Sequence, residues 1–107
     1  MVPVPSIPPP CPYCGGLIRP GVVWFGENID ADVLAKSAAA TDCEVFLTIG
    51  TSALIYPAAG LADEAHRKGA FTIEINLETT PASGLVDLSA QGPAEVVLPQ
   101  VEELLKK

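Results

Sequence analysis

The stretch EVFLTIGTS, residues 44–52, carries a strong signal for the fold class of this chain. Its first six residues form a nearly continuous apolar run, which is typical of a strand buried inside a parallel sheet. Gly50, Thr51 and Ser52 then follow with small and polar side chains. We therefore predict an inner strand over residues 44–49 and a turn directly after it.

Helix and strand signals alternate along the rest of the chain. Asp30 offers an N-cap to a helix rich in alanine. Pro57 suits the first turn of a second helix and Gly69 its C-terminal end, whereas Pro99 interrupts or kinks a third helix. The predicted strands cover residues 22–25, 44–49, 70–75 and a short stretch near 86–88, and the predicted helices cover residues 31–40, 58–68 and 94–106.

This alternation predicts an α/β fold, a partial Rossmann-like, doubly wound parallel sheet with crossover helices. In such sheets, ligands bind beyond the carboxyl ends of the strands. That rule places three polar segments on one edge of the sheet, namely residues 50–52, 76–80 and 91–93. Glycine and hydroxyl groups after a strand suit the phosphate or ribose oxygens of a nucleotide.

Cys11 and Cys14 stand in C-x-x-C spacing and are followed by Gly15 and Gly16, a pattern typical of half a zinc knuckle. A structural zinc needs four nitrogen or sulfur ligands, and the chain contains no second pair of this kind. Either the other pair lies outside this polypeptide or no zinc is bound. The third cysteine, Cys43, is predicted to be a buried small hydrophobe rather than a ligand.

The composition narrows the class of protein. The chain has 107 residues and 11 prolines, several of them in residues 2–12, which predicts an extended arm. A net charge of −7 argues against nucleic-acid binding. Three cysteines are an odd number, and with no signal-peptide pattern they predict a reduced, cytoplasmic protein. No apolar run reaches the roughly 18 residues that a membrane span needs.

Four motifs occur in a characteristic order. They are Cys-x-x-Cys-Gly-Gly from Cys11, Arg-Pro-x-Val-Val-Trp-Phe-Gly-Glu from Arg19, Ile-Gly-Thr-Ser from Ile49 with Tyr-Pro-Ala-Ala-Gly-Leu from Tyr56, and Ile-Asn-x-Glu-Thr-Thr-Pro from Ile75. In order and spacing the chain resembles the C-terminal part of the sirtuins (Sir2 family), the NAD-dependent protein-lysine deacylases. The second and fourth motifs are most similar to the class III deacylases of the desuccinylase and demalonylase type.

The resemblance implies binding roles for three groups of residues. Cys11 and Cys14 correspond to the second cysteine pair of the family's structural zinc site. The implied substrate segment pairs with the backbone of an acylated-lysine peptide by β-augmentation; the alternative for Trp24 and Phe25 is an ordinary place in the core. The implied substrate-binding residues are Val23, Trp24, Phe25, Gly26 and Glu27. The implied NAD-binding residues are Gly50, Thr51, Ser52, Asn76, Glu78, Gln91, Gly92 and Ala94.

The resemblance assigns no catalytic residue to this chain. In the family, the acyl oxygen attacks the nicotinamide ribose, a histidine acts as general base and an O-acyl-ADP-ribose forms. That histidine, the glycine-rich NAD loop and the first cysteine pair are absent from the sequence. His66 is the only histidine, and we expect it at the surface of a helix. Residues 28–30 spell the family's nicotinamide motif but are predicted to be a helix cap.

Three hypotheses remain open. The chain is the C-terminal fragment of a sirtuin, with a proline-rich arm and half zinc knuckle in residues 1–21 and part of the NAD-binding domain in residues 22–107, and is inactive alone. Alternatively, it is one half of a split sirtuin that a partner chain completes, or a non-catalytic module that binds ADP-ribose or a peptide. Because such a partial sheet exposes an edge strand and an apolar face, we also predict self-association.

Overall fold

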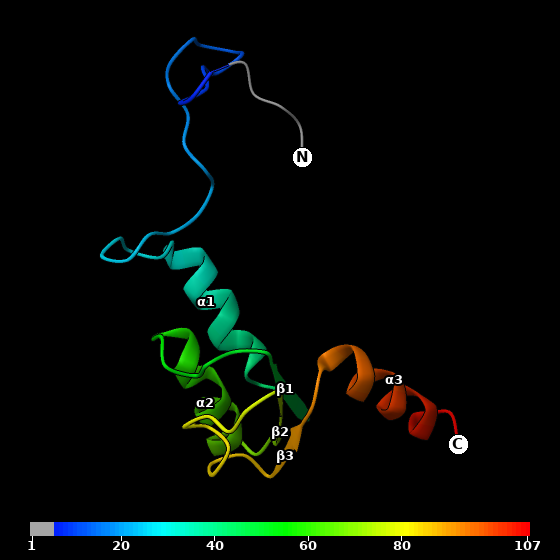
Figure 1. Ribbon diagram of the computed structural model, residues 1–107. Helices are drawn as coiled ribbons and strands as arrows, with labels where there is room; N and C mark the ends of the chain where they lie inside the picture. Colours follow the sequence, from blue (N-terminus) through cyan, green and yellow to red (C-terminus); the bar gives the residue numbers. More distant parts are fainter. Residues whose placement is uncertain (1–5) are drawn as a thin grey trace. The chain divides into compact units, whose positions relative to one another are not determined.

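The computed structural model describes residues 6–107, so the first part of the predicted proline-rich arm lies outside the described residues (Figure 1). The chain divides into two compact units, Met1–Asp30 and Ala31–Lys107. The predicted domain boundary between residues 21 and 22 stays a prediction.

The first unit is built from turns. Pro10 and Leu17 form an isolated antiparallel bridge. Inside it, the Cys11 N–H donates to the Gly16 carbonyl at 2.6 Å, and the Gly15 N–H donates to the Cys11 carbonyl at 2.9 Å. Gly15 has a φ of 74°, a conformation that favours glycine. The two cysteines of the C-x-x-C motif therefore lie on a tight turn.

The predicted strand over residues 22–25 is wrong for this structure, because these residues form no strand and a turn begins at Phe25. The Glu27 N–H donates to the Trp24 carbonyl at 3.0 Å, which closes the turn. A β-rich segment becomes a strand only when a neighbouring strand takes up its backbone hydrogen bonds. No described residue pairs with this segment in that way.

The second unit contains a parallel sheet, as predicted. Its described strands lie side by side in the order in which they occur in the sequence. Val45 lies opposite Phe71, and Ile73 lies opposite Leu88. The last strand begins at the end of the segment predicted for it. The strands are β1 (Val45–Ile49), β2 (Phe71–Asn76) and β3 (Leu88–Gln91), and the helices are α1 (Ala31–Ala40), the 3-10 turn η1 (Ala58–Gly60), α2 (Leu61–Arg67) and α3 (Ala94–Leu105).

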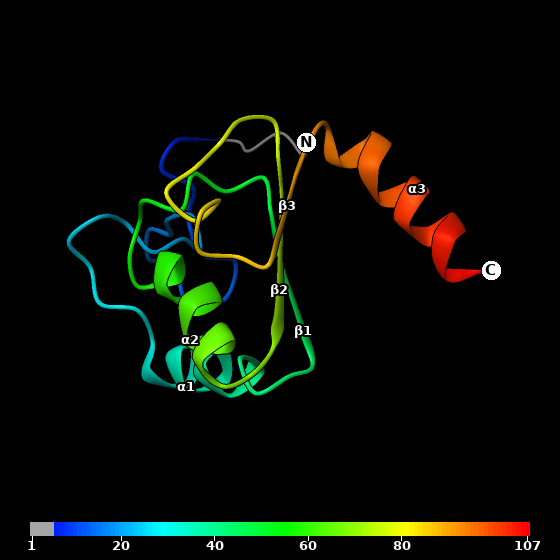
Figure 2. The ribbon, with the colours of Figure 1, turned by 90° about the horizontal axis from the view of Figure 1, so that it is seen from below.

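The helices lie on both sides of this sheet (Figure 2): α1 and α2 on one side, α3 on the other. Only α2 is a crossover helix between described strands, since turns rather than a helix join β2 to β3. Gly69 follows α2 with a φ of 99°, as expected for a C-terminal cap. Pro99 does not interrupt α3, contrary to one of our two expectations. None of the helices within residues 6–107 has the length and apolar character that crossing a bilayer requires.

The core of the second unit is small. Its only large fully buried apolar side chain among the described residues is Ile75, and the others are alanines. Alanine at these positions lets α2 lie close to β1 and β2, but each alanine buries little apolar area. The buried alanines are Ala53, Ala62, Ala65, Ala70 and Ala82.

A buried carboxylate, rather than further apolar side chains, bonds the loop between β2 and β3 to the sheet. Glu74, in the middle of β2, is 0% exposed. Its carboxylate accepts hydrogen bonds from the hydroxyls of Thr80, Ser83 and, at 3.1 Å, Ser89. Ser83 also donates its backbone N–H to Thr80 at 3.0 Å. Glu74 therefore ties the loop between β2 and β3, and β3 itself, to the central strand.

The opposite face of the sheet is apolar and largely uncovered. The register places the odd-numbered residues of β1 beside those of β2 on this face. The amino end of α3 covers only the part around Ile75. Five other apolar side chains of this face are each 41–51% exposed; they are Val45, Leu47, Ile49, Phe71 and Leu88.

We expect this apolar face to make the chain self-associate, since burying such area is worth roughly 25 cal/mol per Å². Replacing Leu47 by aspartate puts a charge in the middle of the face and is expected to weaken association more than tenfold. Leu85→Asp is the matched control, because Leu85 is exposed in the loop between β2 and β3. Sedimentation velocity measures both variants. A wild-type chain that sediments as a monodisperse monomer would contradict this prediction.

Candidate functional site

The carboxyl ends of the three strands meet at one edge of the sheet. The Gly50 N–H, just after β1, donates to the Ile75 carbonyl at 2.9 Å. The Gly92 N–H, just after β3, donates to the Asn76 carbonyl at the same distance. The loops after β1 and β3 are therefore both bonded to the end of β2, as the rule for ligand sites in parallel sheets predicted.

Asn76 links two of these segments through its side chain. Its Nδ2 donates to the Thr51 carbonyl at 2.6 Å. The side-chain nitrogen of Asn76 therefore bonds the loop after β1. Within residues 6–107, the Oδ1 oxygen of Asn76 has no hydrogen-bond partner. Oδ1 is an acceptor of the kind that a ribose hydroxyl requires.

A cavity of about 510 Å³ lies at this edge, which is in the size range of small-ligand sites. Three of the predicted cofactor residues line it: Gly50, Asn76 and Ala94. The sequence analysis placed Leu77 on this edge within residues 76–80 but gave it no role, and it missed Glu95, whose only signal was its place beside Ala94. Glu95 lies in the first turn of α3 and brings a carboxylate to the cavity wall.

The loop after β1 has an unusual backbone. Ala53 has a φ of 55°, a left-handed conformation that non-glycine residues rarely adopt. The Ala53 N–H donates to the Thr51 hydroxyl at 3.2 Å, which supports this turn. The neighbouring Ser52 is exposed, and its hydroxyl has no partner in the described part of the chain. Strained backbone of this kind is found most often at ligand sites.

The remaining predicted cofactor residues differ in position. Gln91 is the last residue of β3 and lies at the same edge. Glycine is favoured at position 92, because its φ of 152° suits few L side chains and a Cβ there would lie 3.0 Å from Cγ2 of Val97. Glu78 is exposed in the loop after β2 and does not line the cavity.

His66 lies at the amino ends of the strands. It shares a hydrogen-bonding network with Thr72, which is near the start of β2. Its Nδ1 is 3.4 Å from Oδ2 of Asp87. The same carboxylate oxygen accepts the Thr72 backbone N–H at 2.8 Å and the Thr72 hydroxyl at 3.0 Å. His66 is half-exposed, and this position separates it from the cavity, in keeping with its predicted surface role.

The hydrogen bond from the Thr72 backbone N–H lowers the pKa of Asp87 most, and the bond from the Thr72 hydroxyl lowers it further. The nearby His66 adds to the effect. A carboxyl whose pKa is lower in the folded state stabilises the fold above its unfolded pKa of about 4 and loses that contribution as pH falls. We therefore expect stability to be steady near neutral pH and to decline below about pH 4. Asp87→Asn should flatten that decline, whereas Asp42→Asn, at an exposed site, should not. Thermal unfolding across pH 3 to 7 tests this.

In the first unit, the two thiols of the C-x-x-C turn lie close together. Hydrogen bonds from the Tyr13 backbone, the Cys14 backbone and the Cys14 thiol lower the pKa of Cys11. Within residues 6–107, no cluster of three or more His, Cys, Asp or Glu side chains is arranged to hold a metal. The chain thus offers two of the four ligands of a structural zinc, and the zinc site stays a prediction.

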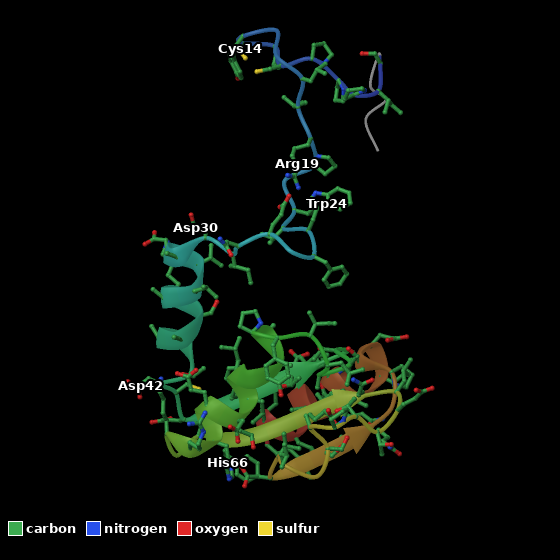
Figure 3. The ribbon with its side chains drawn as sticks, turned by 90° about the vertical axis from the view of Figure 1, so that its left-hand side faces the viewer. Cys14, Arg19, Trp24, Asp30, Asp42 and His66 are labelled. Carbon is green, nitrogen blue, oxygen red and sulfur yellow. The ribbon has the colours of Figure 1, made fainter. Side chains whose placement is uncertain are left out.

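The predicted substrate segment is exposed rather than part of a core. Phe25 is 91% exposed and Trp24 54%. Figure 3 shows Arg19 beside Trp24, and its guanidinium carbon lies 5.6 Å from the centre of the indole ring. Arg19 also pairs with Glu27 at 2.7 Å. Arg19 is part of a sequence motif, but the sequence gives it no role, because its partner Glu27 lies eight residues away.

Comparisons with known proteins find relatives of similar sequence. The model of the Sir2 family matches residues 3–57. An NAD-dependent protein deacylase of Aquifex aeolicus (strain VF5) is 42% identical over 106 residues, which are 98% of this chain and 44% of that protein. The NAD-dependent protein deacylase of Mycobacterium tuberculosis (strain ATCC 25618 / H37Rv) is 43% identical over 104 residues, 96% of this chain and 44% of that protein. The chain thus spans less than half the length of these relatives.

Solved structures show the same relation. The crystal structure of a Sir2 homologue in complex with NAD superposes with a TM-score of 0.88 and 39% identity, covering 95% of this chain and 41% of the other. A Sir2 protein bound to an acetylated peptide superposes with a TM-score of 0.82 and 31% identity, covering 92% of this chain and 42% of the other.

Proposed function

The chain belongs to the Sir2 family, and we propose that it acts as the C-terminal portion of an NAD-dependent protein deacylase. In this proposal it supplies part of the NAD site and the segment that pairs with an acylated-lysine peptide. One observation carries the proposal: the carboxyl ends of β1 and β2 and the start of α3 surround a cavity lined by Gly50, Asn76 and Ala94.

The chemistry of this edge suits the ribose and phosphate groups of NAD. Oδ1 of Asn76 can accept a hydrogen bond from a ribose hydroxyl, because Nδ2 is held by the Thr51 carbonyl. The free Ser52 hydroxyl can donate to a phosphate or ribose oxygen. Gly50, with a φ of 67°, lets the backbone turn toward the ligand without a side chain in the way. When bound, NAD would supply the ribose carbon that accepts the acyl oxygen.

This chain contributes binding rather than proton transfer to the proposed reaction. A general base must lie within hydrogen-bond distance of the proton that it removes. His66, the only histidine in the sequence, is instead held near Asp87 at the amino ends of the strands. We therefore propose that the chain alone does not release nicotinamide from NAD.

Titration of ¹⁵N-labelled chain with ADP-ribose tests the nucleotide site. We expect amide shifts at Gly50, Ser52, Asn76 and Ala94, and none at Gly69, which lies at the other end of the strands. A lack of shifts at millimolar ADP-ribose, or shifts confined to other residues, would overturn the proposal.

A second assay separates an enzyme portion from a binding-only module. The chain is mixed with the N-terminal portion of the Aquifex aeolicus deacylase, whose C-terminal portion it would replace. We expect nicotinamide release from NAD and an acylated peptide only in the mixture. ADP-ribose binding without any release in the mixture would favour the non-catalytic module.

We also infer that the chain belongs to a protein of the desuccinylase and demalonylase type, whose choice of acyl group rests on residues outside this chain. The wording of the Arg19 and Ile75 motifs, which is most similar to the desuccinylase and demalonylase type, supports this inference. In an assay of the whole protein to which this chain belongs, succinyl-lysine peptide should react faster than the matched acetyl-lysine peptide. A faster reaction with the acetyl peptide would contradict it.

A further inference from the structure

A guanidinium–carboxylate pair closes the segment from Arg19 to Glu27. Nη1 of Arg19 lies 2.7 Å from Oε1 of Glu27, and Nη2 lies 3.2 Å from Oε2. This two-pronged geometry is stronger and more directional than a simple ion pair. Nη2 also donates to the Val22 carbonyl at 3.4 Å, inside the loop that the pair closes.

Trp24 makes three contacts with Arg19 and Glu27. Its ring lies under the Arg19 guanidinium, a cation–π contact. Its backbone N–H donates to Oε2 of Glu27 at 3.3 Å, and its carbonyl accepts the Glu27 N–H at 3.0 Å. Both backbone groups of Trp24 are therefore used within the loop, and the indole is fixed against the arginine.

The two neighbours of Trp24 are in the opposite situation. Val23 and Phe25 have no backbone hydrogen bond to any other residue in the range 6–107. Their side chains are 55% and 91% exposed. Every second residue of the segment thus offers a free N–H and a free carbonyl, the arrangement that an added strand requires.

We propose that Arg19 and Glu27 are positioning residues, which hold residues 23–25 as a preformed edge for the backbone of an extended acyl-lysine peptide. This inference rests on the proposed function and assigns a role to two residues outside the peptide contact itself. The physical gain is preorganisation: a segment that is already shaped loses less conformational entropy when the peptide binds. Trp24 serves as the fixed point, while Val23 and Phe25 make the main-chain bonds.

Arg19→Met tests the proposal, because it keeps most of the apolar stem and removes the charge. Arg67→Met is the matched control: Arg67 forms an exposed ion pair with Asp63 at 3.0 Å on α2. The probe is a fluorescein-labelled peptide with one acetylated lysine, and anisotropy gives its affinity for each full chain. We expect Arg19→Met to weaken binding at least tenfold and Arg67→Met to change it less than twofold.

Trp24 is the only tryptophan of the chain, so its fluorescence reports on this segment alone. Arg19→Met should shift its emission to longer wavelength and increase its quenching by acrylamide, and Arg67→Met should do neither. If Arg19→Met lowers the midpoint of thermal unfolding, the variant Arg19→Lys decides, because it keeps a cation beside Glu27 and the Trp24 ring. Recovered peptide affinity in Arg19→Lys supports the inference, and its loss overturns it.

The outcomes separate this inference from the proposed function. A wild-type chain that binds the acetylated peptide, together with an Arg19→Met variant that binds it equally well, overturns only the positioning role. A wild-type chain that does not distinguish the acetylated peptide from its unmodified counterpart overturns the proposed substrate segment, and with it the role of Arg19 and Glu27.

Discussion

Replacing Glu74 by alanine is expected to lower the free energy of unfolding by about 3 kcal/mol. The side chain is fully buried, and three hydroxyls donate to its carboxylate. Buried donors that lose their acceptor cost about 1–3 kcal/mol each, less where a hydroxyl can turn to another partner. Because the apolar core is small, the β2–β3 loop depends strongly on these hydrogen bonds.

Urea unfolding measures this loss of free energy. The dependence of the free energy on urea concentration should be the same in both proteins, which shows that unfolding exposes the same area. Glu74→Gln keeps the size of the side chain and one acceptor oxygen, so we expect an intermediate loss. Glu44→Ala is the matched control, since Glu44 is an exposed glutamate just before β1. A loss below about 0.5 kcal/mol for Glu74→Ala, within the range of ordinary surface substitutions, would show that the carboxylate does not hold the loop.

Acidification should act on the same group. Burial raises the pKa of Glu74, but the hydrogen bonds from Ser83, Thr80 and Ser89 outweigh it, so the pKa lies below the ordinary value. Its stabilising effect is therefore present at neutral pH and is lost on acidification, in the same direction as for Asp87.

Asn76→Asp is expected to weaken ADP-ribose binding at least tenfold. The substitution replaces the Nδ2 donor by a carboxylate oxygen, which would then face the Thr51 carbonyl at about the same place. Two acceptors repel each other, so the loop after β1 should move away from the end of β2. The added charge also opposes the phosphates of the ligand.

Isothermal titration calorimetry with ADP-ribose measures the effect. The chain contains only one other asparagine, Asn28, so Asn28→Asp is a control with the same change of charge. Asn28 lies in the first unit, within the motif that we interpret as a helix cap, and its substitution should leave the affinity unchanged. Equal losses in both variants would mean that net charge rather than the Asn76 amide governs binding.

Much of the second unit could be predicted from local patterns. The apolar run of residues 44–49 and the alanine-rich helix over residues 31–40 were predicted to within about one residue, because their signals depend on neighbouring residues. The rule for parallel sheets then predicted that the segments after β1, β2 and β3 share one edge, which the structure confirms. Residues 22–25 carry an equally β-rich pattern, yet form no strand, since a strand also needs a partner that the pattern does not contain.

The α/β class, the parallel sheet and the set of polar residues that follow its strands could all be predicted from local patterns. That Glu74 is buried beneath the loop of Thr80 and Ser83, and that Arg19 pairs with Glu27, became evident only from the three-dimensional arrangement. Helix and strand signals arise from the preferences of adjacent residues, whereas the partner of a buried carboxylate or of a guanidinium depends on which distant segments the fold brings within hydrogen-bond distance.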